Sequence, residues 1–174
     1  ILSDENLAVR LIGCKLTGNA TGITGCQYLQ LQDSEVFGST TAAVTALNAL
    51  PWIITSSVIA NNATGLTTTQ AGLGTGAVQV ADSRIVGNGS HGILLENAVV
   101  RFLAHRCTVT GNAGDGIRLR GNNGSTFNIT DSLVDDNTGD GLNIDNTSSA
   151  CLAPSGDAFE GTVTDSRIVG NADD

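Results

Sequence analysis

The segment Asp-Ser-Arg-Ile-Val-Gly-Asn stands at residues 82–88 and recurs without a single change at residues 165–171. A second segment, Cys-x-aliphatic-Thr-Gly-Asn, stands at residues 14–19 and recurs at residues 107–112. Repetition of this kind is the sequence signature of architectures in which similar structural units stack on one another. The rest of the chain aligns on these two segments as further, more divergent copies.

Every aligned repeat has one polar turn residue, three positions after an aliphatic residue. The intervals between these turn residues are 20, 23, 26, 24, 25 and 34 residues, so the repeats share a cross-section but differ in loop length. The longest interval contains an insertion at about residues 146–161. Asparagine tolerates the left-handed backbone conformation of tight turns, and we expect its amide to bond to the asparagines of adjacent repeats. The turn residues are Asn19, Ser39, Asn62, Asn88, Asn112, Asn137 and Asn171.

Each repeat contains three short segments in which apolar and polar residues alternate. Alternation with a period of two over so few residues predicts strands rather than helices. Four inward-facing columns keep their character from repeat to repeat, three of them apolar and one small. The apolar columns are Ile23, Val44, Leu66, Ile93, Ile117 and Leu142 in the first segment, Val9, Leu29, Trp52, Val78, Phe102 and Phe127 in the second, and Leu16, Val36, Ile59, Ile85, Val109, Val134 and Ile168 in the third. The small column is Cys14, Ser34, Ser57, Ser83, Cys107, Ser132 and Ser166.

These columns predict an all-β solenoid in which each strand stacks on the like strand of the next repeat, about 4.8 Å away. The pattern aliphatic-x-x-Asn followed by Gly-Ile, as in residues 109–117, resembles the right-handed parallel β-helix repeat of the pectin-lyase-like superfamily. The resemblance runs from about residue 1 to residue 171. It implies a right-handed parallel β-helix, and the aligned repeats predict about seven coils in one domain, residues 1–174.

The superfamily includes polysaccharide lyases, glycoside hydrolases, epimerases, phage tailspikes, adhesins and surface proteins. The resemblance therefore predicts the fold and leaves the function open. It implies a location outside the cell or at a cell or virion surface. The formal net charge of -9 repels phosphate backbones, which argues against nucleic-acid binding. No apolar run approaches the roughly 20 residues that a membrane-spanning helix needs, so we expect no membrane insertion.

The two ends of the sequence align with the boundaries of the repeat. Ile1 aligns with the first residue of a first segment, and Asp174 stands where the next Gly-Ile is expected. An uncapped β-helix end exposes strand edges and apolar core, and both favour association. These ends predict either a slice of a longer rod or a subunit that associates end to end.

Charged residues gather in the later repeats, at outward positions of the first segment and just before its glycine. Earlier repeats carry mostly threonine at the same outward positions. Stacking of the repeats is expected to bring the charged residues into one patch, which makes them the candidate ligand-binding residues. They are His91, Glu96, Asp115, Arg118, Arg120, Asp140, Asn143 and Asp145.

Several chemistries fit this patch. Asp115 and Asp140 of adjacent coils are expected about 5 Å apart, which suits a retaining pair of carboxylates in glycoside hydrolysis. The same two residues are the candidate ligands of a Ca²⁺ ion, the one cofactor that the sequence suggests. Arg118 or Arg120 is suited to clamping a uronate or sulfate group. His91 is suited to acting as a general base near neutral pH.

A purely structural interpretation of the patch is equally open. Aspartate before glycine is ordinary turn chemistry. Glu96, Arg118, Arg120 and Asp145 alternate in sign, so they are also expected to pair across neighbouring coils. Polygalacturonases of the same fold carry Asn-x-Asp, Asp-Asp, Gly-His-Gly and Arg-x-Lys motifs in that order. The similar motifs here stand in a different order, so no catalytic role is carried over.

Three further predictions concern residues outside the patch. Cys14 and Cys107 share an inward column four coils apart, about 19 Å, so they are expected to be small core residues and not a disulfide. His105 is expected to face solvent on the second sheet. Four aspartates share one turn column and are expected to bond to turn amides; they are Asp33, Asp82, Asp131 and Asp165.

The leading functional hypothesis is a non-enzymatic scaffold, a β-helix segment of an adhesin-like or phage-like surface protein whose partners include polysaccharides or cell-surface glycans. One alternative is a polysaccharide lyase or glycoside hydrolase that uses the patch. The absence of aromatic residues from the outward face of the first segment favours the scaffold, because sugars stack on aromatic rings. The other alternative is a filament subunit that self-associates through uncapped ends.

Overall fold

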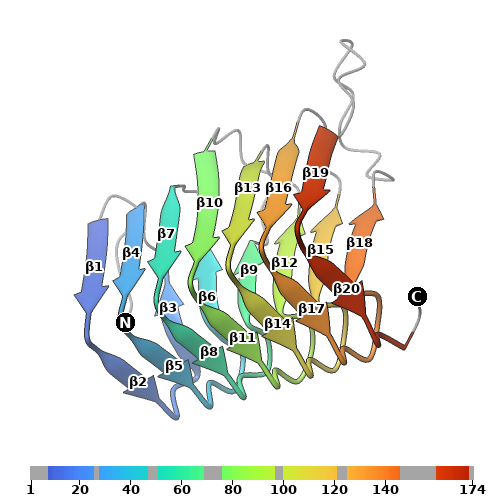
Figure 1. Ribbon diagram of the computed structural model, residues 1–174. Coiled ribbons are helices and arrows are strands. Elements are labelled where there is room, and N and C mark those ends of the chain that lie inside the picture. Colours follow the sequence, from blue (N-terminus) through green and yellow to red (C-terminus); the bar gives the residue numbers. More distant parts are fainter. Residues whose placement is uncertain are drawn as a thin grey trace.

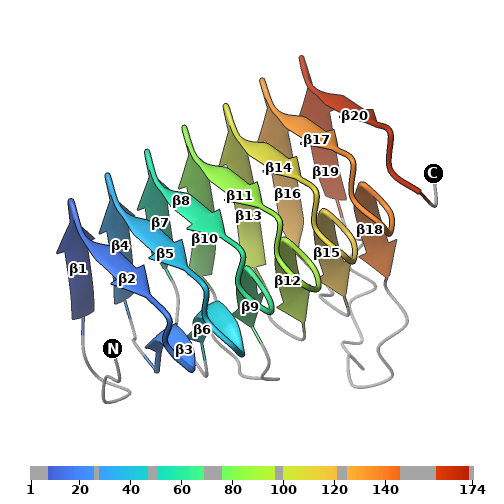
Figure 2. The same cartoon turned by 90° about the horizontal axis from the view of Figure 1, so that it is seen from below.

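The computed structural model describes residues 8–25, 28–46, 51–68, 76–96, 100–120, 125–145 and 160–172. In these residues the chain forms strands β1 to β20 and no helix. The strands belong to three parallel sheets, two with seven described strands and one with six. Figures 1 and 2 show the strands of each sheet as a row along the axis of a single rod.

One strand from each sheet makes up one coil of the rod. The first segment of each repeat forms sheet A, with strands β3 (Thr21–Thr24), β6 (Ala42–Ala46), β9 (Leu66–Thr68), β12 (Ile93–Glu96), β15 (Ile117–Arg120) and β18 (Leu142–Asp145). The second forms sheet B, with β1 (Ala8–Ile12), β4 (Tyr28–Gln32), β7 (Trp52–Thr55), β10 (Gly76–Ala81), β13 (Val100–His105), β16 (Thr126–Thr130) and β19 (Glu160–Thr164). The third forms sheet C, with β2 (Lys15–Thr17), β5 (Glu35–Phe37), β8 (Val58–Ala60), β11 (Arg84–Val86), β14 (Thr108–Thr110), β17 (Leu133–Asp135) and β20 (Arg167–Val169).

The register of the sheets confirms the predicted apolar columns. In sheet C, Ile85 pairs with Ile59 on one side and with Val109 on the other, and the same column continues through every strand of that sheet. The columns line the inside of the rod, where most of their members have no solvent-exposed surface. The sheet B column ends at Gly161, because the ring of Phe127 occupies the space that a side chain at that position would need.

The small column is a ladder of hydroxyl groups inside the rod. The backbone N–H of Ser34 donates to the Ser57 hydroxyl at 3.2 Å, and the N–H of Ser57 donates to the Ser83 hydroxyl at 3.1 Å. The Ser57 and Ser83 hydroxyls donate in turn to the carbonyls of Thr55 and Ala81, each at 2.7 Å. Serine suits this column because it is small and because its hydroxyl satisfies a buried amide, while Cys107 meets only the requirement of size and a weak donor.

The turn asparagines form a second buried ladder. The side-chain amide of Asn88 donates to Oδ1 of Asn112 at 2.9 Å, and that of Asn112 donates to Oδ1 of Asn137 at 2.8 Å. Each of these Oδ1 atoms also accepts the backbone N–H of the preceding ladder residue, at 3.1 Å in both cases. The predicted bonding between stacked asparagines is confirmed. At Ser39 the side chain is too short to join, and its buried hydroxyl has no hydrogen-bond partner among the described residues.

The left-handed conformation of the turn is adopted by the residue before the ladder position and not by the ladder residue. This residue is Asn61 with φ 53° and Asp136 with φ 51° in two coils, and it is glycine in each of the other described coils. A second left-handed column lies between sheets B and C. Its members are Gly13, Asp33, Ser56, Asp82, Arg106, Asp131 and Asp165. The four aspartates thus share one turn column, as predicted.

Some predictions fall on other parts of the chain. Ile1 and Asp174 lie outside the described residues, as does most of the predicted insertion. Only its last residues are described, where they begin β19. Among the described residues, no helix is long and apolar enough to cross a membrane.

The asparagine ladder predicts a large cost for Asn112→Ala. This change removes the acceptor that both amide groups of the buried Asn88 share, and buried donors left unpaired cost about 1–3 kcal/mol each. We expect Asn112→Ala to lower the free energy of unfolding by about 2–4 kcal/mol in urea denaturation. The exposed Asn128 serves as the control, since Asn128→Ala is expected to change stability by less than about 0.5 kcal/mol. Equal effects of the two substitutions would contradict a structural role for the ladder.

Candidate functional site

The eight candidate residues lie on three consecutive coils at the outer face and margin of sheet A. Register places Arg120 between Glu96 and Asp145, and Arg118 beside Asn143. The remaining three, His91, Asp115 and Asp140, stand in the turns that lead into β12, β15 and β18. We call these eight residues the charged patch. The structure brings all eight together. Most of the polar contacts of these side chains are with other members of the patch and not with solvent-facing free groups.

Asp115 is the most buried charged residue of the patch, with a side chain that is 9% exposed. Its Oδ2 lies 3.3 Å from Nη1 of Arg118, and its Oδ1 accepts the backbone N–H of Asp140 at 3.0 Å. Both carboxylate oxygens are therefore occupied by partners from the protein itself. Asp115 therefore holds the turn before β18 through the N–H of Asp140, and it holds the guanidinium of Arg118 in its own coil.

The outer charges of the patch form a chain of ion pairs across coils. Arg120 lies 3.3 Å from Glu96 on one side and 3.4 Å from Asp145 on the other. Arg118 approaches the same Asp145 at 3.9 Å. This arrangement confirms the pairing across coils that the alternating signs predicted. The side chains are 22–47% exposed, so each pair contributes little to stability, in the range of about 0–1 kcal/mol.

The patch carries more negative than positive charge. Its four carboxylates and two guanidinium groups sum to a net charge of -2 when His91 is neutral. Asp140 accepts a hydrogen bond from the side-chain amide of Asn143 at 2.6 Å. A uronate or sulfate would have to compete with Asp115, Glu96 and Asp145 for the guanidinium groups, so the patch is poorly suited to an anionic sugar.

The surroundings of His91 define its protonation state. Its Nδ1 accepts the backbone N–H of Asp115 at 3.0 Å, so the neutral ring carries its proton on Nε2. Burial lowers the pKa of His91 below its ordinary value of 6.5. The charge of Arg118 lowers the pKa further, while Asp115 and Glu96 oppose the shift. His91 is thus a hydrogen-bond acceptor that orders the turn before β15.

The Ca²⁺ hypothesis has few ligands available to it. Within the described ranges, no group of three or more histidine, cysteine or acidic side chains is arranged to hold a metal ion. Ca²⁺ takes about six to eight oxygen ligands, whereas Asp115 and Asp140 offer two carboxylates, one of which is bonded at both oxygens. A Ca²⁺ ion would therefore need most of its ligands from water or from its partner, and the hypothesis stays a prediction.

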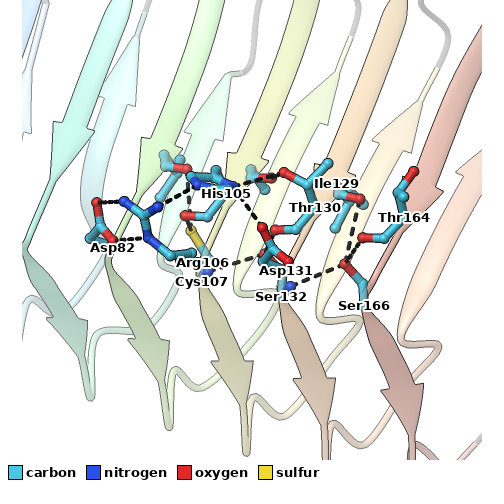
Figure 3. A network of polar contacts seen from close by, with 12 residues as sticks. Asp82, His105, Arg106, Cys107, Ile129, Thr130, Asp131, Ser132, Thr164 and Ser166 are labelled. Carbon is cyan, nitrogen blue, oxygen red and sulfur yellow. Dashed lines mark hydrogen bonds and ion pairs between the residues drawn. The ribbon is translucent and has the colours of Figure 1, made fainter.

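A second polar cluster lies at the corner between sheets B and C, and the sequence interpretation missed it (Figure 3). Arg106 binds Asp82 of the preceding coil through two hydrogen bonds, of 2.6 and 2.9 Å. Nη1 of Arg106 also lies 2.7 Å from Nε2 of His105, and Nδ1 of His105 lies 2.9 Å from the Thr130 hydroxyl. His105 faces outward, as predicted, but it is bonded on both ring nitrogens.

The Arg106 guanidinium, by its hydrogen bonds, lowers the pKa of the Asp82 carboxyl. The side chain of Asp82 therefore forms an ion pair with the next coil. The sequence had predicted only hydrogen bonds from this aspartate to turn amides. The alignment of the repeats could have predicted this ion pair, because Arg106 occupies the same turn column as Asp82, one coil later. The cluster borders a surface groove of about 720 Å³ whose lining residues are Arg106, Cys107, Thr108, Asp131, Ser132, Leu133, Asp165 and Arg167.

The two described cysteines are free thiols, in agreement with the prediction. Cys107 is buried and donates through Sγ to the carbonyl of Val80 at 3.2 Å. Burial raises the pKa of the Cys107 thiol, which keeps it protonated and unreactive at neutral pH. Cys107 is therefore a small core residue and contributes nothing to the chemistry of the groove beside it.

The three parallel sheets, the inward columns, the hydroxyl ladder and the asparagine ladder define a parallel β-helix. A family model described as a right-handed β-helix region matches residues 1–155. The match covers most of the chain, so the protein belongs to the right-handed β-helix family. The predicted fold class is thereby confirmed. No curated protein and no solved structure matches the chain.

The environment of His91 predicts an imidazole pKa below 6.5 and a neutral ring with its proton on Nε2. A depressed pKa means that the unfolded chain binds a proton more readily than the folded one. The stabilising contribution of His91 is therefore complete above pH 6.5 and is lost as the pH falls through the folded pKa. NMR titration of the two histidines, assigned with His91→Gln, measures both properties. A His91 pKa above 6.5, or a proton on Nδ1, would contradict this account.

The contacts of Asp115 predict that Asp115→Asn destabilises the protein. The asparagine side chain has one acceptor oxygen fewer than the aspartate side chain. Its NH₂ group would face a donor, either the guanidinium of Arg118 or the N–H of Asp140. We expect a loss of about 1–3 kcal/mol in the free energy of unfolding, measured by urea denaturation. The matched control is Asp136→Asn, because Asp136 is exposed and asparagine tolerates its left-handed conformation. If both variants are as stable as the natural chain, Asp115 is not the anchor described here.

Proposed function

We propose that this chain is a scaffold segment of a surface protein, located outside the cell or on a cell or virion surface, and that its charged patch contacts neutral glycans without catalysis. The observation that carries the proposal is that both oxygens of Asp115 already have partners within the protein. The carboxylate best placed for chemistry is nearly buried, and both of its oxygens are bonded within the protein.

A catalytic role requires a group that is free to exchange a proton or attack a substrate. Asp115 is bonded at both oxygens, and Nδ1 of His91 accepts a backbone N–H. Arg120 is held between carboxylates of the two neighbouring coils, and Arg118 lies between Asp115 of its own coil and Asp145 of the next. Catalysis would need these contacts to break first, and breaking them would release the turns that position the same groups.

Contact with neutral sugars requires a row of hydrogen-bonding groups more than it requires free charge. The outward column of sheet A that contains Arg118 and Asn143 runs back through Leu94 to Thr67, Thr45 and Thr24. Thr67 is only 6% exposed, so the polar groups that this column offers are Thr24, Thr45, Arg118 and Asn143. Hydroxyl and amide groups both donate and accept hydrogen bonds, as sugar hydroxyls do. The net negative charge of the patch favours neutral over acidic polysaccharides.

The proposal is tested with a glycan array and a polysaccharide-degradation screen, each run with and without Ca²⁺. The natural chain is compared with Arg118→Ala/Asp140→Ala and with a control pair outside the patch, Arg84→Ala/Asp136→Ala, after denaturation has shown that all three are folded. We expect binding to neutral glycans by the natural chain and the control, loss of binding in the patch variant, and no degradation products from any of them.

Other outcomes distinguish the alternatives. Degradation by the natural chain that is lost in the patch variant would favour a polysaccharide lyase or glycoside hydrolase. Binding that requires Ca²⁺ would favour an ion held between the glycan and the pair Asp115 and Asp140. No binding by any folded protein would contradict the glycan contact.

A further inference from the structure

The sequence contains six Asn-x-Ser/Thr triplets, which are the acceptor signal for N-linked glycosylation. This signal ordinarily marks a surface position, because the attached sugar is bulky and strongly hydrated. Two of the acceptors, Asn123 and Asn146, lie outside the described residues. Of the other four, three belong to the asparagine ladder column and one does not. They are Asn19, Asn62 and Asn88 in the ladder column and Asn128 outside it.

The amide nitrogens of Asn62 and Asn88 are fully engaged inside the rod. Asn62 is 2% exposed, and its Nδ2 donates to the carbonyl of Ala60 at 3.0 Å and to Oδ1 of Asn88 at 3.1 Å. Asn88 is 1% exposed, and its Nδ2 donates to Oδ1 of Asn112 at 2.9 Å and to the carbonyl of Ile59 at 3.4 Å. Both hydrogens of each amide group therefore point at acceptors of the protein.

The space beside the ladder amides is also filled. A Cβ atom added at Gly92 would lie 2.9 Å from Nδ2 of Asn112, and one added at Gly116 would lie 2.8 Å from Nδ2 of Asn137. Carbon atoms of side chains essentially never approach other heavy atoms so closely. The column thus lacks room for a single additional carbon at these positions, and a sugar ring is much larger.

Asn128 has the opposite surroundings. It lies in the middle of β16, on the outer face of sheet B, where it pairs with Leu103 on one side and with Thr162 on the other (Figure 1). The side chain of Asn128 is exposed, while the next residue, Ile129, points into the core and is 0% exposed. A sugar on Nδ2 of Asn128 would extend from this face into solvent.

We infer that the fold divides these acceptor signals, so that a glycan on Asn128 is compatible with the folded rod whereas a glycan on Asn62 or Asn88 prevents its coils from stacking. Glycosyl transfer breaks the bond between C1 of the donor sugar and a phosphate oxygen and forms a bond between C1 and Nδ2. The diphosphate leaves with a proton from Nδ2. At Asn62 or Asn88 the product therefore has a sugar in place of a hydrogen that the ladder uses.

The consequence concerns how the chain matures. Enzymes that glycosylate unfolded chains at this signal would modify the ladder before it is buried. The natural chain must therefore fold before it meets such enzymes, or apart from them. This narrows the route by which a surface protein of this sequence reaches its location, and it does not depend on the glycan contact proposed for the charged patch.

The inference is tested by producing the full chain in two hosts, the bacterial cytosol and the secretory pathway of eukaryotic cells, where N-glycosylation precedes folding. The natural chain is compared with Thr21→Ala/Thr64→Ala/Ser90→Ala, which removes the three ladder signals and keeps every ladder asparagine. These three side chains are only partly buried. We expect equal yields of protease-resistant protein from the cytosol. In the secretory pathway we expect a yield of the natural chain about tenfold or more below that of the variant, because each buried donor left unpaired shifts the folding equilibrium by about that factor.

Mass spectrometry of the folded and retained chains from the secretory pathway supplies the second measurement. Folded natural chains are expected to carry a glycan at Asn128 and none at Asn62 or Asn88, and retained chains are expected to carry glycans at the ladder. The matched control is Asn128→Gln, which removes the exposed acceptor and is expected to leave the yield of the natural chain unchanged.

Three results would overturn the inference. The first is a folded chain with a glycan at Asn62 or Asn88. The second is an equal yield of the natural chain and the triple variant in the secretory pathway, or a gain in the variant that appears in the bacterial cytosol as well. The third is a gain from Asn128→Gln as large as that from the triple variant, because the exposed site would then obstruct folding as much as the ladder does.

Discussion

The asparagine ladder is the interaction on which the rest of this structure depends. From Asn88 to Asn171, each Oδ1 of the ladder accepts two N–H groups from the preceding coil, one from the backbone and one from a side chain, for example the two N–H groups that Asn88 directs at Asn112. These groups are buried, so a slip of one residue between coils would leave them unpaired. The ladder therefore sets the register, and the apolar columns of sheets B and C follow from it, because each described strand of these two sheets ends at a fixed distance before a ladder residue.

The same register determines what the surface can do. Outward residues at one position of the coil become neighbours in space, so residues about 24 positions apart in the chain act on each other directly. Glu96, Arg120 and Asp145 become a chain of ion pairs for this reason. Asp82 and Arg106 become a doubly bonded pair at the next corner of the rod. In these two clusters the charges are paired across the repeat itself, which favours a scaffold over a catalyst.

Sequence patterns were sufficient to predict the strands, the four inward columns and the gathering of the charged patch, because all of these follow from the alignment of repeats. They were insufficient for features that depend on the backbone conformation of a turn or on the rotamer of a side chain. The left-handed position precedes the ladder asparagine, since the buried amide requires the asparagine itself to point inward. The contacts of Arg106 with Asp82 and His105 depend on its side-chain rotamer, which the sequence periodicity does not predict. Nor could the sequence reveal that both oxygens of Asp115 are occupied, because one partner is a backbone N–H.

Native-state hydrogen exchange measured by NMR tests the central claim most directly. If the ladder fixes the stacking of the coils, the backbone amides of Asn88, Asn112 and Asn137 exchange as slowly as the amides at the centres of the strands, since all of them open only when coils separate. Exchange of these three amides at rates close to those of an unfolded chain, with the strand amides still protected, would contradict the claim and would leave the apolar columns alone to hold the rod in register.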